Sequence, residues 1–369
     1  MILKELELKN FRNYDNLNLL FSPNINIFYG DNAEGKTNIL ESIYVLAITK
    51  SHRINIDKHL IKEGREATKI IGKANINNEN KKFEILINEK GKRVKINNII
   101  IKKISNYISK LNVIMFDPID LDLIKGNPSS RRKFLNIEIA QVNNKYLSNL
   151  KEYNLLIKNR NEYIKNKRYE DLDLKYLSII NEQIAKKGAI IYQTRYKFIE
   201  KLNKQTREIY KNIFEEGSFF IEYKTNIEIN NFEDLDKIKK DIYKKLSSNI
   251  KRDLYLGMTQ NGPHRDDMIF YINNKDVRLH ASQGQQRIII ICIKLGEIKI
   301  FKEETGKYPI LLLDDVFSEL DEKKKSNIIK YLQKNIQTFI TTTDLNNIDS
   351  NLFKKSKTFY VKSKKVIEN

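Results

Sequence analysis

Short segments of alternating or mostly apolar residues run through the first 116 residues and predict β-strands. Residues 5–9 and 16–19 alternate between apolar and polar side chains, as a strand with one buried face does. Residues 25–29 are mostly apolar and predict a buried strand. The complete set of strands predicted in this part is 5–9, 16–19, 25–29, 82–87, 94–96 and 113–116. A helix is predicted at 38–44, directly after a glycine-containing turn.

Apolar residues recur at helical spacing between about residues 129 and 216. The members of one stripe are Leu177, Ile180, Ile184, Ile191, Phe198 and Leu202. Gly188 and Arg195 interrupt the stripe, so this region predicts helix packed on helix rather than an extended coiled coil. Strands are predicted again at 219–223, 269–272, 310–313, 338–341 and 358–361.

The order of these segments predicts an α/β fold in which both ends of the chain contribute to one core. The sequence contains no internal repeat and no linker rich in Gly, Ser or Pro. We therefore assign residues 1–116 and 255–369 to a core of mixed sheets and helices. Residues 117–254 are assigned to a mainly helical insertion.

The charge balance of the chain points to a polyanionic partner. Lys and Arg number 67 against 47 Asp and Glu, which gives a formal net charge of +20 over 369 residues. Nucleic acid is the first candidate, since a basic surface that neutralises phosphates also releases counterions. The alternative is compositional drift, because an A+T-rich genome also favours a chain crowded with Lys, Asn and Ile.

Cysteine usage and apolar run lengths bear on where the chain acts. The single Cys292 excludes an intrachain disulfide and fits a reducing compartment. The sequence has no apolar run long enough to cross a bilayer, and its first residues lack the pattern of a secretory signal. We expect a cytoplasmic protein without a membrane partner.

A phosphate-binding loop is the clearest chemical signal. It consists of Gly30, Asp31, Asn32, Ala33, Glu34, Gly35, Lys36 and Thr37, and it satisfies the pattern G-x-x-x-x-G-K-[ST] between a predicted strand and a predicted helix. The glycines let backbone N–H groups approach phosphate oxygens, and Lys36 reaches the β- and γ-phosphates. Thr37 offers a hydroxyl to Mg²⁺. The flanking strand and helix favour nucleotide binding over a chance turn with a surface lysine.

A second nucleotide motif is expected where the apolar run 310–313 ends in Asp314 and Asp315. At the carboxyl end of a buried strand, Asp314 can hold the Mg²⁺ that bridges the phosphates. Asp315 can then orient the attacking water or accept its proton, which makes it the candidate catalytic residue. The alternative is a buried strand that happens to end in two solvated acids.

The run 282–287 predicts the start of a helix, with Ser282 as its cap and Gly284 and Gln285 in its first turn. Such a helix start is an anion site. Because the phosphate loop already encloses its own nucleotide, these residues are predicted to contact the γ-phosphate held by another copy. That geometry predicts a nucleotide between two subunits of a symmetric dimer. An ordinary capped helix is the alternative.

Taken together, these motifs resemble the ATPase heads of the ABC/SMC/Rad50 class and, within it, the RecF family. The resemblance covers nearly the whole chain. The segments that carry it are 8–14, 30–41, 50–53, 116–135, 160–161, 262–267, 281–287 and 313–321, with Ser318 and Asp321 in the loop after Asp315. It implies a P-loop ABC-type ATPase head with an inserted helical domain.

The resemblance also implies an activity and partners. Expected are ATP and Mg²⁺ as cofactors, an ATP-dependent homodimer that binds double-stranded and gapped DNA, and action with RecO and RecR to help RecA load on single-stranded DNA. A weak, DNA-stimulated ATPase that times this switch is also expected. The roles would lie in DNA repair, recombination, replication and the SOS response.

Three departures from the wider ABC class concern hydrolysis. Asp315 stands where glutamate is usual, and its shorter side chain holds water less well. Thr341, Thr342 and Thr343 stand where the class often has a switch histidine, and no Q-loop glutamine follows residues 113–116. Either Asp117 or Asp120 is left as the candidate for that place. These departures predict slow hydrolysis.

The main alternative is an ABC-type ATPase subunit that couples ATP to another protein partner in transport, although this role does not need a charge of +20. An ATP-driven nuclease would need a further acidic cluster, for which 266–267 is the only candidate, and for His264 beside it a structural or signalling role is favoured over metal ligation. For DNA, the candidate phosphate contacts are Arg131, Arg132, Lys133, Lys165, Lys167 and Arg168.

Overall fold

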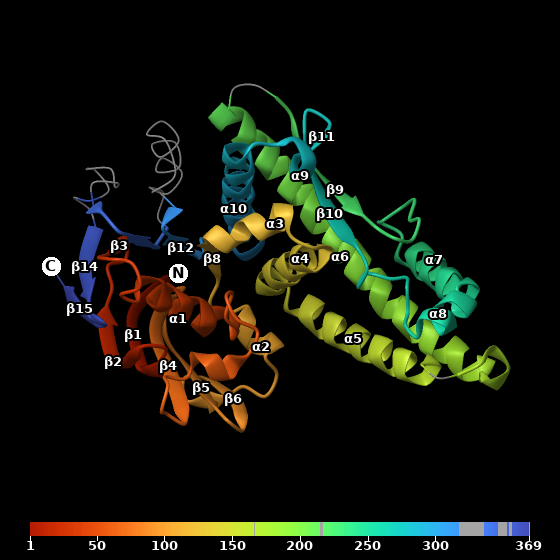
Figure 1. Ribbon diagram of the computed structural model, residues 1–369, viewed down its shortest axis with the longest axis horizontal. Helices are drawn as coiled ribbons and strands as arrows, with labels where there is room; N and C mark the ends of the chain where they lie inside the picture. Colours follow the sequence, from red (N-terminus) through yellow and green to blue (C-terminus); the bar gives the residue numbers. More distant parts are fainter. Residues whose placement is uncertain (166, 215–216, 317–335, 346–352, 354–355, 369) are drawn as a thin grey trace. The chain divides into compact units, whose positions relative to one another are not determined.

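The computed structural model describes residues 1–165, 167–214, 217–316, 336–345, 353 and 356–368 (Figure 1). The chain divides into two compact units. The head unit comprises Met1–Asp120 and Ile290–Asn369, and the helical unit comprises Leu121–Ile289. No helix in the described residues combines the length and the apolar character needed to cross a membrane.

The head unit contains a six-stranded sheet of order β15-β14-β3-β13-β12-β8, drawn from both chain ends. Its strands are β3 (Ile25–Tyr29), β8 (Val113–Phe116), β12 (Ile310–Asp314), β13 (Thr338–Thr342), β14 (Ser356–Lys362) and β15 (Lys365–Glu368). All neighbouring pairs are parallel except β14 with β15. Because parallel strands end at one edge, the segments after β3, β8, β12 and β13 meet there, which places the candidate chemistry on one side of the sheet.

A second sheet of the head unit is antiparallel, with the order β2-β1-β4-β5-β6-β7. Its strands are β1 (Ile2–Phe11), β2 (Tyr14–Leu20), β4 (Ala67–Ile76), β5 (Glu79–Asn88), β6 (Gly91–Ile96) and β7 (Ile99–Ile100). The head unit also contains α1 (Lys36–Ile48), η1 (Asp57–Leu60) and α2 (Ser105–Ile108). Helix α1 approaches β4 so closely that a Cβ on Gly72 would lie 2.3 Å from Leu46 Cδ2. The sheet therefore supports the helix that follows the phosphate loop.

The helical unit is built around one long helix, α6 (Leu174–Phe214), which packs on α5 (Asn144–Ile164) and α7 (Leu235–Ser248). Its other elements are η3 (Tyr169–Asp171), α3 (Asp122–Lys125), α4 (Pro128–Val142), α8 (Ile250–Leu256), α9 (Val277–His280) and a sheet of β9 (Phe219–Lys224), β10 (Asp267–Ile272) and β11 (Lys275–Asp276). Two elements cross the division between the units, η2 (Pro118–Leu121) and α10 (Gln283–Thr305).

The predicted apolar stripe of α6 is buried along its length, as helix packed on helix requires. Gly188 and Arg195 interrupt the apolar stripe because both residues lie inside the helical unit, where neighbouring helices pack against them. A Cβ at Gly188 would lie 3.1 Å from Ile242 Cδ1 of α7 and 3.5 Å from Tyr153 Cε2 of α5, so glycine lets three helices approach closely. Arg195 is 1% exposed and lies inside the unit.

The predicted division at residue 255 differs from the structure, where residues 255–289 belong to the helical unit. Strand β10 pairs with β9 along its whole length, from Asp267 opposite Lys224 to Ile272 opposite Phe219. Arg131 of α4 also forms an ion pair with Asp267. These contacts join β10 to elements that precede it by at least 40 residues, which the local pattern around residue 255 does not reveal.

Arg195 is the centre of a buried polar cluster, and removing its charge is expected to destabilise the helical unit. Its guanidinium donates to Tyr146 Oη at 3.0 Å, Asn136 Oδ1 at 3.0 Å and Asp266 Oδ2 at 3.2 Å. Burial raises the pKa of Asp266 to about 6 although Arg195 opposes that change. Arg195→Met leaves this carboxyl without its cation, at an expected cost of about 3–5 kcal/mol.

Urea unfolding monitored by circular dichroism checks this expectation. The exposed Arg252→Met, which removes the same charge from the surface of α8, is the control. An Arg195→Met transition that coincides with that of Arg252→Met would contradict the role given to the cluster.

Candidate functional site

The phosphate loop connects β3 to α1 through backbone angles that only glycine adopts easily. Gly30 and Gly35 have φ values of 144° and 109°. A Cβ on Gly30 would lie 2.2 Å from Val361 O, and one on Gly35 would lie 2.7 Å from Tyr14 Oη. Tyr14 also donates to Gly35 O at 3.2 Å, which fixes the end of the loop. The two glycines are therefore required by close contacts as well as by backbone conformation.

Lys36 extends into the loop that precedes it. Its ammonium donates to Gly30 O and Asp31 O, both at 2.7 Å, and the residue is 8% exposed. Burial lowers the pKa of Lys36, whereas the charges of Asp315 and Asp314 oppose that change. The loop thus places one cation among backbone groups at a helix N-terminus, which fits a phosphate chain.

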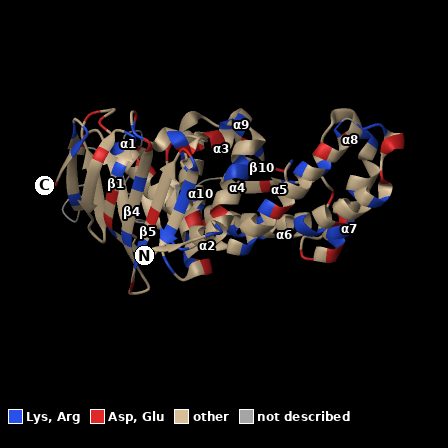
Figure 2. Cartoon of the chain, turned by 90° about the horizontal axis from the view of Figure 1, so that it is seen from below, with Lys and Arg blue, Asp and Glu red and all other residues tan. Residues whose placement is uncertain are grey.

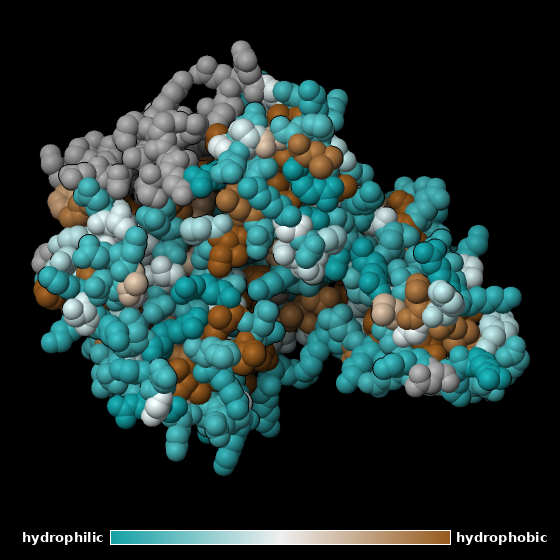
Figure 3. Space-filling view, viewed as in Figure 1, coloured by the Kyte–Doolittle hydropathy of each residue, from teal (hydrophilic) through white to brown (hydrophobic). Residues whose placement is uncertain are grey.

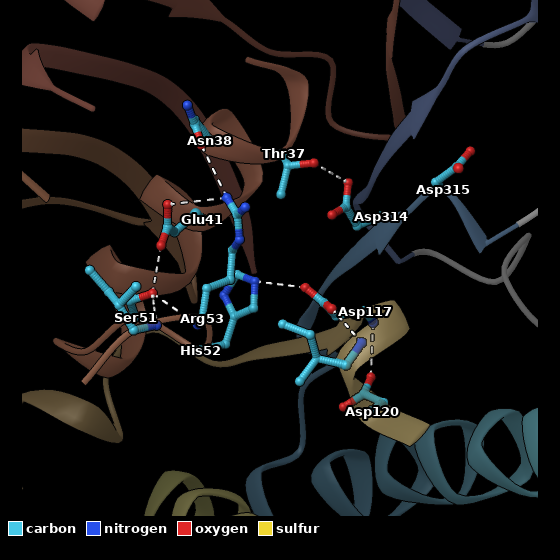
Figure 4. A network of polar contacts seen from close by, with 12 residues as sticks. Thr37, Asn38, Glu41, Ser51, His52, Arg53, Asp117, Asp120, Asp314 and Asp315 are labelled. Atoms are coloured by element: carbon cyan, nitrogen blue, oxygen red, sulfur yellow. Dashed lines mark hydrogen bonds and ion pairs between the residues drawn. The ribbon is translucent and has the colours of Figure 1, made fainter. Parts of the chain in front are cut away.

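Thr37 and Asp314 are 277 residues apart in sequence and meet in the structure. Thr37 Oγ1 donates to Asp314 Oδ1 at 2.9 Å (Figure 4). Asp314 is 6% exposed, and burial raises the pKa of its carboxyl group. A hydroxyl and a carboxylate side by side are the oxygen ligands that Mg²⁺ takes in nucleotide sites, where substrate phosphates and water complete the shell. The residues present therefore fit the expected metal.

Asp315 follows β12 with a φ of 51°, a conformation uncommon for aspartate. Its N–H donates to Thr341 Oγ1 at 3.0 Å, and the same hydroxyl donates to Asp314 Oδ1 at 2.6 Å. Thr341, at the end of β13, thus contacts both acidic residues. Sequence reasoning recognised Thr341 only as the place where a histidine is common and missed this contact.

The ATP hydrolysis expected from the sequence should be about tenfold slower in Thr341→Val, because valine keeps the shape but removes the hydrogen bond that orients Asp314. A hydrogen bond to a charged group contributes about 1.5–3 kcal/mol. Steady-state assays that separate kcat from KM check this. Thr338→Val, at the opposite end of β13, is the matched control, since the hydroxyl of Thr338 bonds Ile336 O instead. Equal rates for the two variants would remove Thr341 from the site.

A polar network supports α1 one turn after the phosphate loop (Figure 4). Glu41 is fully buried and accepts hydrogen bonds from Arg12 at 2.7 and 2.8 Å and from Ser51 at 2.5 Å. Arg53, from the same loop as Ser51, donates to Asn38 Oδ1 at 3.2 Å. The predicted family segment 50–53 is therefore bound to the helix that carries Thr37.

His52 in this loop pairs with Asp117, which directly follows β8. The two side chains lie 2.8 Å apart, from Nε2 to Oδ2. Burial alone would raise the pKa of Asp117, but His52 lowers it overall. Since β8 lies beside β12 with Phe116 opposite Leu313, Asp117 is at the same sheet edge as Asp314. Asp120, the other candidate for the Q-loop place, pairs instead with Lys294 at 3.4 Å.

The signature residues belong to the helical unit. Gln285 N donates to Ser282 Oγ at 3.2 Å, and Ser282 N donates to Gln285 Oε1 at 2.9 Å, so the two form a reciprocal cap of α10. Both residues and Gly284 are exposed. The predicted capped helix start is therefore present. Ser318 and Asp321 lie outside the described residues.

The predicted DNA contacts separate into buried and exposed residues. The prediction is wrong for Arg131, which is 2% exposed and donates to Asp267 and to three backbone carbonyls of residues 123–126. Arg132 is half-buried and donates to Asp266 O at 2.7 Å. The candidates that remain exposed are Lys133, Lys165, Lys167 and Arg168.

The segment considered for a nuclease metal is occupied by structural contacts. Asp266 and Asp267 pair with Arg195 and Arg131. His264 Nδ1 lies 2.6 Å from Tyr153 Oη and its Nε2 lies 3.0 Å from Thr259 O. Burial lowers the pKa of His264 to about 4, so its ring is neutral at pH 7. These contacts support the structural role expected for His264.

Comparison with known proteins assigns this chain to a family. The family described as RecF/RecN/SMC N terminal domain matches residues 2–366. A relative from Listeria welshimeri named DNA replication and repair protein RecF is 43% identical over 363 residues, which is 98% of each chain.

Solved structures agree with this match. The recombination mediator protein RecF with ATP, from the RecFOR pathway, superposes with a TM-score of 0.93 at 33% identity, covering 100% of this chain and 97% of that one. A Smc head bound to the C-winged helix domain of ScpA has a TM-score of 0.56 at 14% identity, covering 100% and 98%, and shows the fold alone. The predicted fold class, a P-loop ATPase head with mixed sheets and helices, is confirmed.

Proposed function

This chain belongs to the RecF family of the RecF/RecN/SMC N-terminal domain proteins, and from that premise we propose that it is an ATP-dependent DNA-binding protein of recombinational repair and replication. The observation that carries the proposal is the hydrogen bond between Thr37 and Asp314, which joins the two nucleotide motifs across the sequence. The comparisons support a recombination mediator and not the transport alternative.

ATP is proposed to bind with its phosphates on the loop that ends in Lys36. Thr37 and Asp314 would hold Mg²⁺, which when bound neutralises charge on the β- and γ-phosphates. Thr341 keeps the Asp314 carboxylate in place. Asp315, which follows β12, would orient the attacking water and accept its proton in a slow hydrolysis step.

The capped start of α10 is proposed to complete this site on a second copy of the chain. Ser282 and Gln285 are exposed and satisfy each other's backbone N–H groups, so their helix start is ordered before any ligand arrives. A helix N-terminus with a hydroxyl beside it favours an anion such as the γ-phosphate. ATP would thereby bring two copies together in a symmetric dimer that opens on hydrolysis.

DNA is the proposed partner of this dimer because the chain carries a charge of +20. Figure 2 shows Lys and Arg residues distributed over the helices and strands of both units. Contacts of Lys133, Lys165, Lys167 and Arg168 to phosphates would be independent of sequence and sensitive to salt. The ATP-bound relative is a mediator of the RecFOR pathway, so proteins of the RecO and RecR type are the proposed partners in a cytoplasmic reaction at gapped DNA.

Mixing two inactive variants tests the shared site. Lys36→Ala removes the phosphate contact of one half-site, and Ser282→Arg blocks the helix start that would face it. Each variant alone is expected to stay monomeric with ATP in light scattering. A 1:1 mixture is expected to recover ATP-dependent dimers. The Ser282→Arg chain keeps an intact phosphate loop and the Lys36→Ala chain keeps an intact helix start at Ser282, so the two together form one complete nucleotide site.

One further measurement, ATP binding by Ser282→Arg, completes the experiment. Ser282→Arg should bind ATP as the unmodified chain does, because its own phosphate loop is intact. Full dimer formation by Ser282→Arg alone, or no recovery in the mixture, would contradict a nucleotide shared between two copies.

A further inference from the structure

One end of the helical unit exposes tyrosine rings to solvent. Tyr255 of α8 is 89% exposed, Tyr169 of η3 is 44% exposed and Tyr176 of α6 is 38% exposed. Apolar neighbours are exposed with them, including Leu174 at 61%. Figure 3 shows apolar side chains gathered over α8 on this part of the surface. Single exposed apolar residues need no explanation, but a cluster of them marks an interaction site.

Lysine side chains lie against these rings. Lys251 Nζ is 5.4 Å from the centroid of Tyr169. Lys251 and Tyr255 are four residues apart on α8 and therefore share one face of that helix. Lys167 Nζ similarly lies 5.1 Å from the centroid of Tyr163. Two lysine ammonium groups thus each lie over one tyrosine ring in this part of the helical unit.

The parts of this surface are held together by contacts between three helices. Tyr163 of α5 and Tyr176 of α6 pack with their ring centroids 4.5 Å apart. A Cβ on Gly257, directly after α8, would lie 3.9 Å from Lys165 Cγ, so the end of α5 lies beside the end of α8. We call the set Tyr163, Tyr169, Tyr176 and Tyr255, with Lys167 and Lys251, the tyrosine patch.

The chemistry of the tyrosine patch selects its partner. Aromatic rings that face solvent can stack on flat nucleobases, and ammonium groups beside them can reach phosphates of the same strand. Bases in a duplex are already stacked and paired, so only a single strand can offer them. The carboxylate of Asp173 caps α6 by accepting from the N–H groups of Lys175 and Tyr176, whereas Glu170 and Asp171 of η3 are exposed beside Tyr169.

We infer that the tyrosine patch binds single-stranded DNA by base stacking. The inference rests on the proposed DNA-binding function and adds a single-strand site that shares Lys167 with the proposed duplex contacts and needs neither ATP nor a dimer. A protein that binds double-stranded and single-stranded DNA at the same time would recognise the junction between them. An acidic segment of a partner protein is the competing occupant, and the test below separates the two.

The test uses a fluorescein-labelled oligothymidylate of 15 nucleotides, the full chain and no ATP. The unmodified protein is expected to bind it in fluorescence anisotropy. Tyr255→Ala is expected to weaken this affinity about 5- to 150-fold, the range measured for loss of one stacked base. Tyr255→Phe keeps the ring and is expected to bind within about twofold of the unmodified chain. Lys251→Ala is expected to reduce the salt dependence by about 0.7 in log–log slope.

A duplex of equal length, measured with ATP, separates this inference from the proposed function. Tyr255→Ala is expected to bind that duplex as the unmodified chain does. Oligothymidylate affinity that is unchanged in Tyr255→Ala, or equally reduced in Tyr255→Phe, overturns the inference. Absence of oligothymidylate binding in the unmodified chain also overturns it and assigns the patch to a protein partner. If the unmodified chain does not bind the duplex in the presence of ATP, the proposed function is contradicted, but the comparison of oligothymidylate affinities between variants remains valid.

Discussion

Replacing Lys36 with alanine is expected to weaken ATP binding about 10- to 150-fold. The ammonium of Lys36 is buried in the phosphate loop and is the cation that would face the phosphate chain. Hydrogen bonds to charged groups contribute about 1.5–3 kcal/mol, and each 1.4 kcal/mol corresponds to a factor of ten. Isothermal titration calorimetry with ATP and Mg²⁺ measures the change directly.

The matched control for this variant is Lys58→Ala, which removes an exposed lysine of η1 in the same unit. It is expected to bind ATP as the unmodified chain does. If Lys36→Ala and Lys58→Ala bind ATP equally well, the phosphate loop does not hold the nucleotide in the way proposed.

Replacing Asp315 with asparagine is expected to reduce hydrolysis by about 10²- to 10⁴-fold while ATP still binds. Asparagine has nearly the shape of aspartate but cannot accept the proton of the attacking water, and general-base catalysis contributes a factor of that size. Because Lys36, Thr37 and Asp314 remain, the ATP-bound dimer should accumulate. Phosphate release measures the rate, and size-exclusion chromatography with light scattering measures the dimer.

Asp315→Glu is the conservative control. It restores a carboxylate at the position after β12, so hydrolysis should persist. A monomeric Asp315→Asn in saturating ATP would contradict the proposal that bound nucleotide closes two copies, and unchanged hydrolysis would remove Asp315 from the chemistry.

Strands β8, β12 and β13 could be predicted from the sequence because they are short runs of mostly apolar and β-branched residues. Such runs arise when both faces of a strand are buried, and β8, β12 and β13 are buried at every position. Strand β4 was missed, since Gly72 and two lysines interrupt its pattern. The glycine is there because Leu46 packs against it, a contact between residues 26 positions apart.

The nucleotide motifs could also be predicted, because the residues of each lie next to one another in sequence. Contacts between distant residues could not. No local sequence pattern predicts the pair of His52 with Asp117 or the contact of Thr341 with Asp314. Arg131 shows the converse error. A run of basic residues predicts solvent-exposed side chains, but Arg131 binds Asp267, 136 residues later in the sequence, and is a buried structural residue.

Duplex-DNA binding by fluorescence anisotropy, with and without ATP over a salt series, tests the central claim most directly. Binding is expected to appear or tighten with ATP and to weaken steeply as salt rises, because ATP closes the dimer and phosphate contacts supply the affinity. Binding that is equally strong without ATP, or absent in its presence, would contradict an ATP-controlled DNA-binding protein.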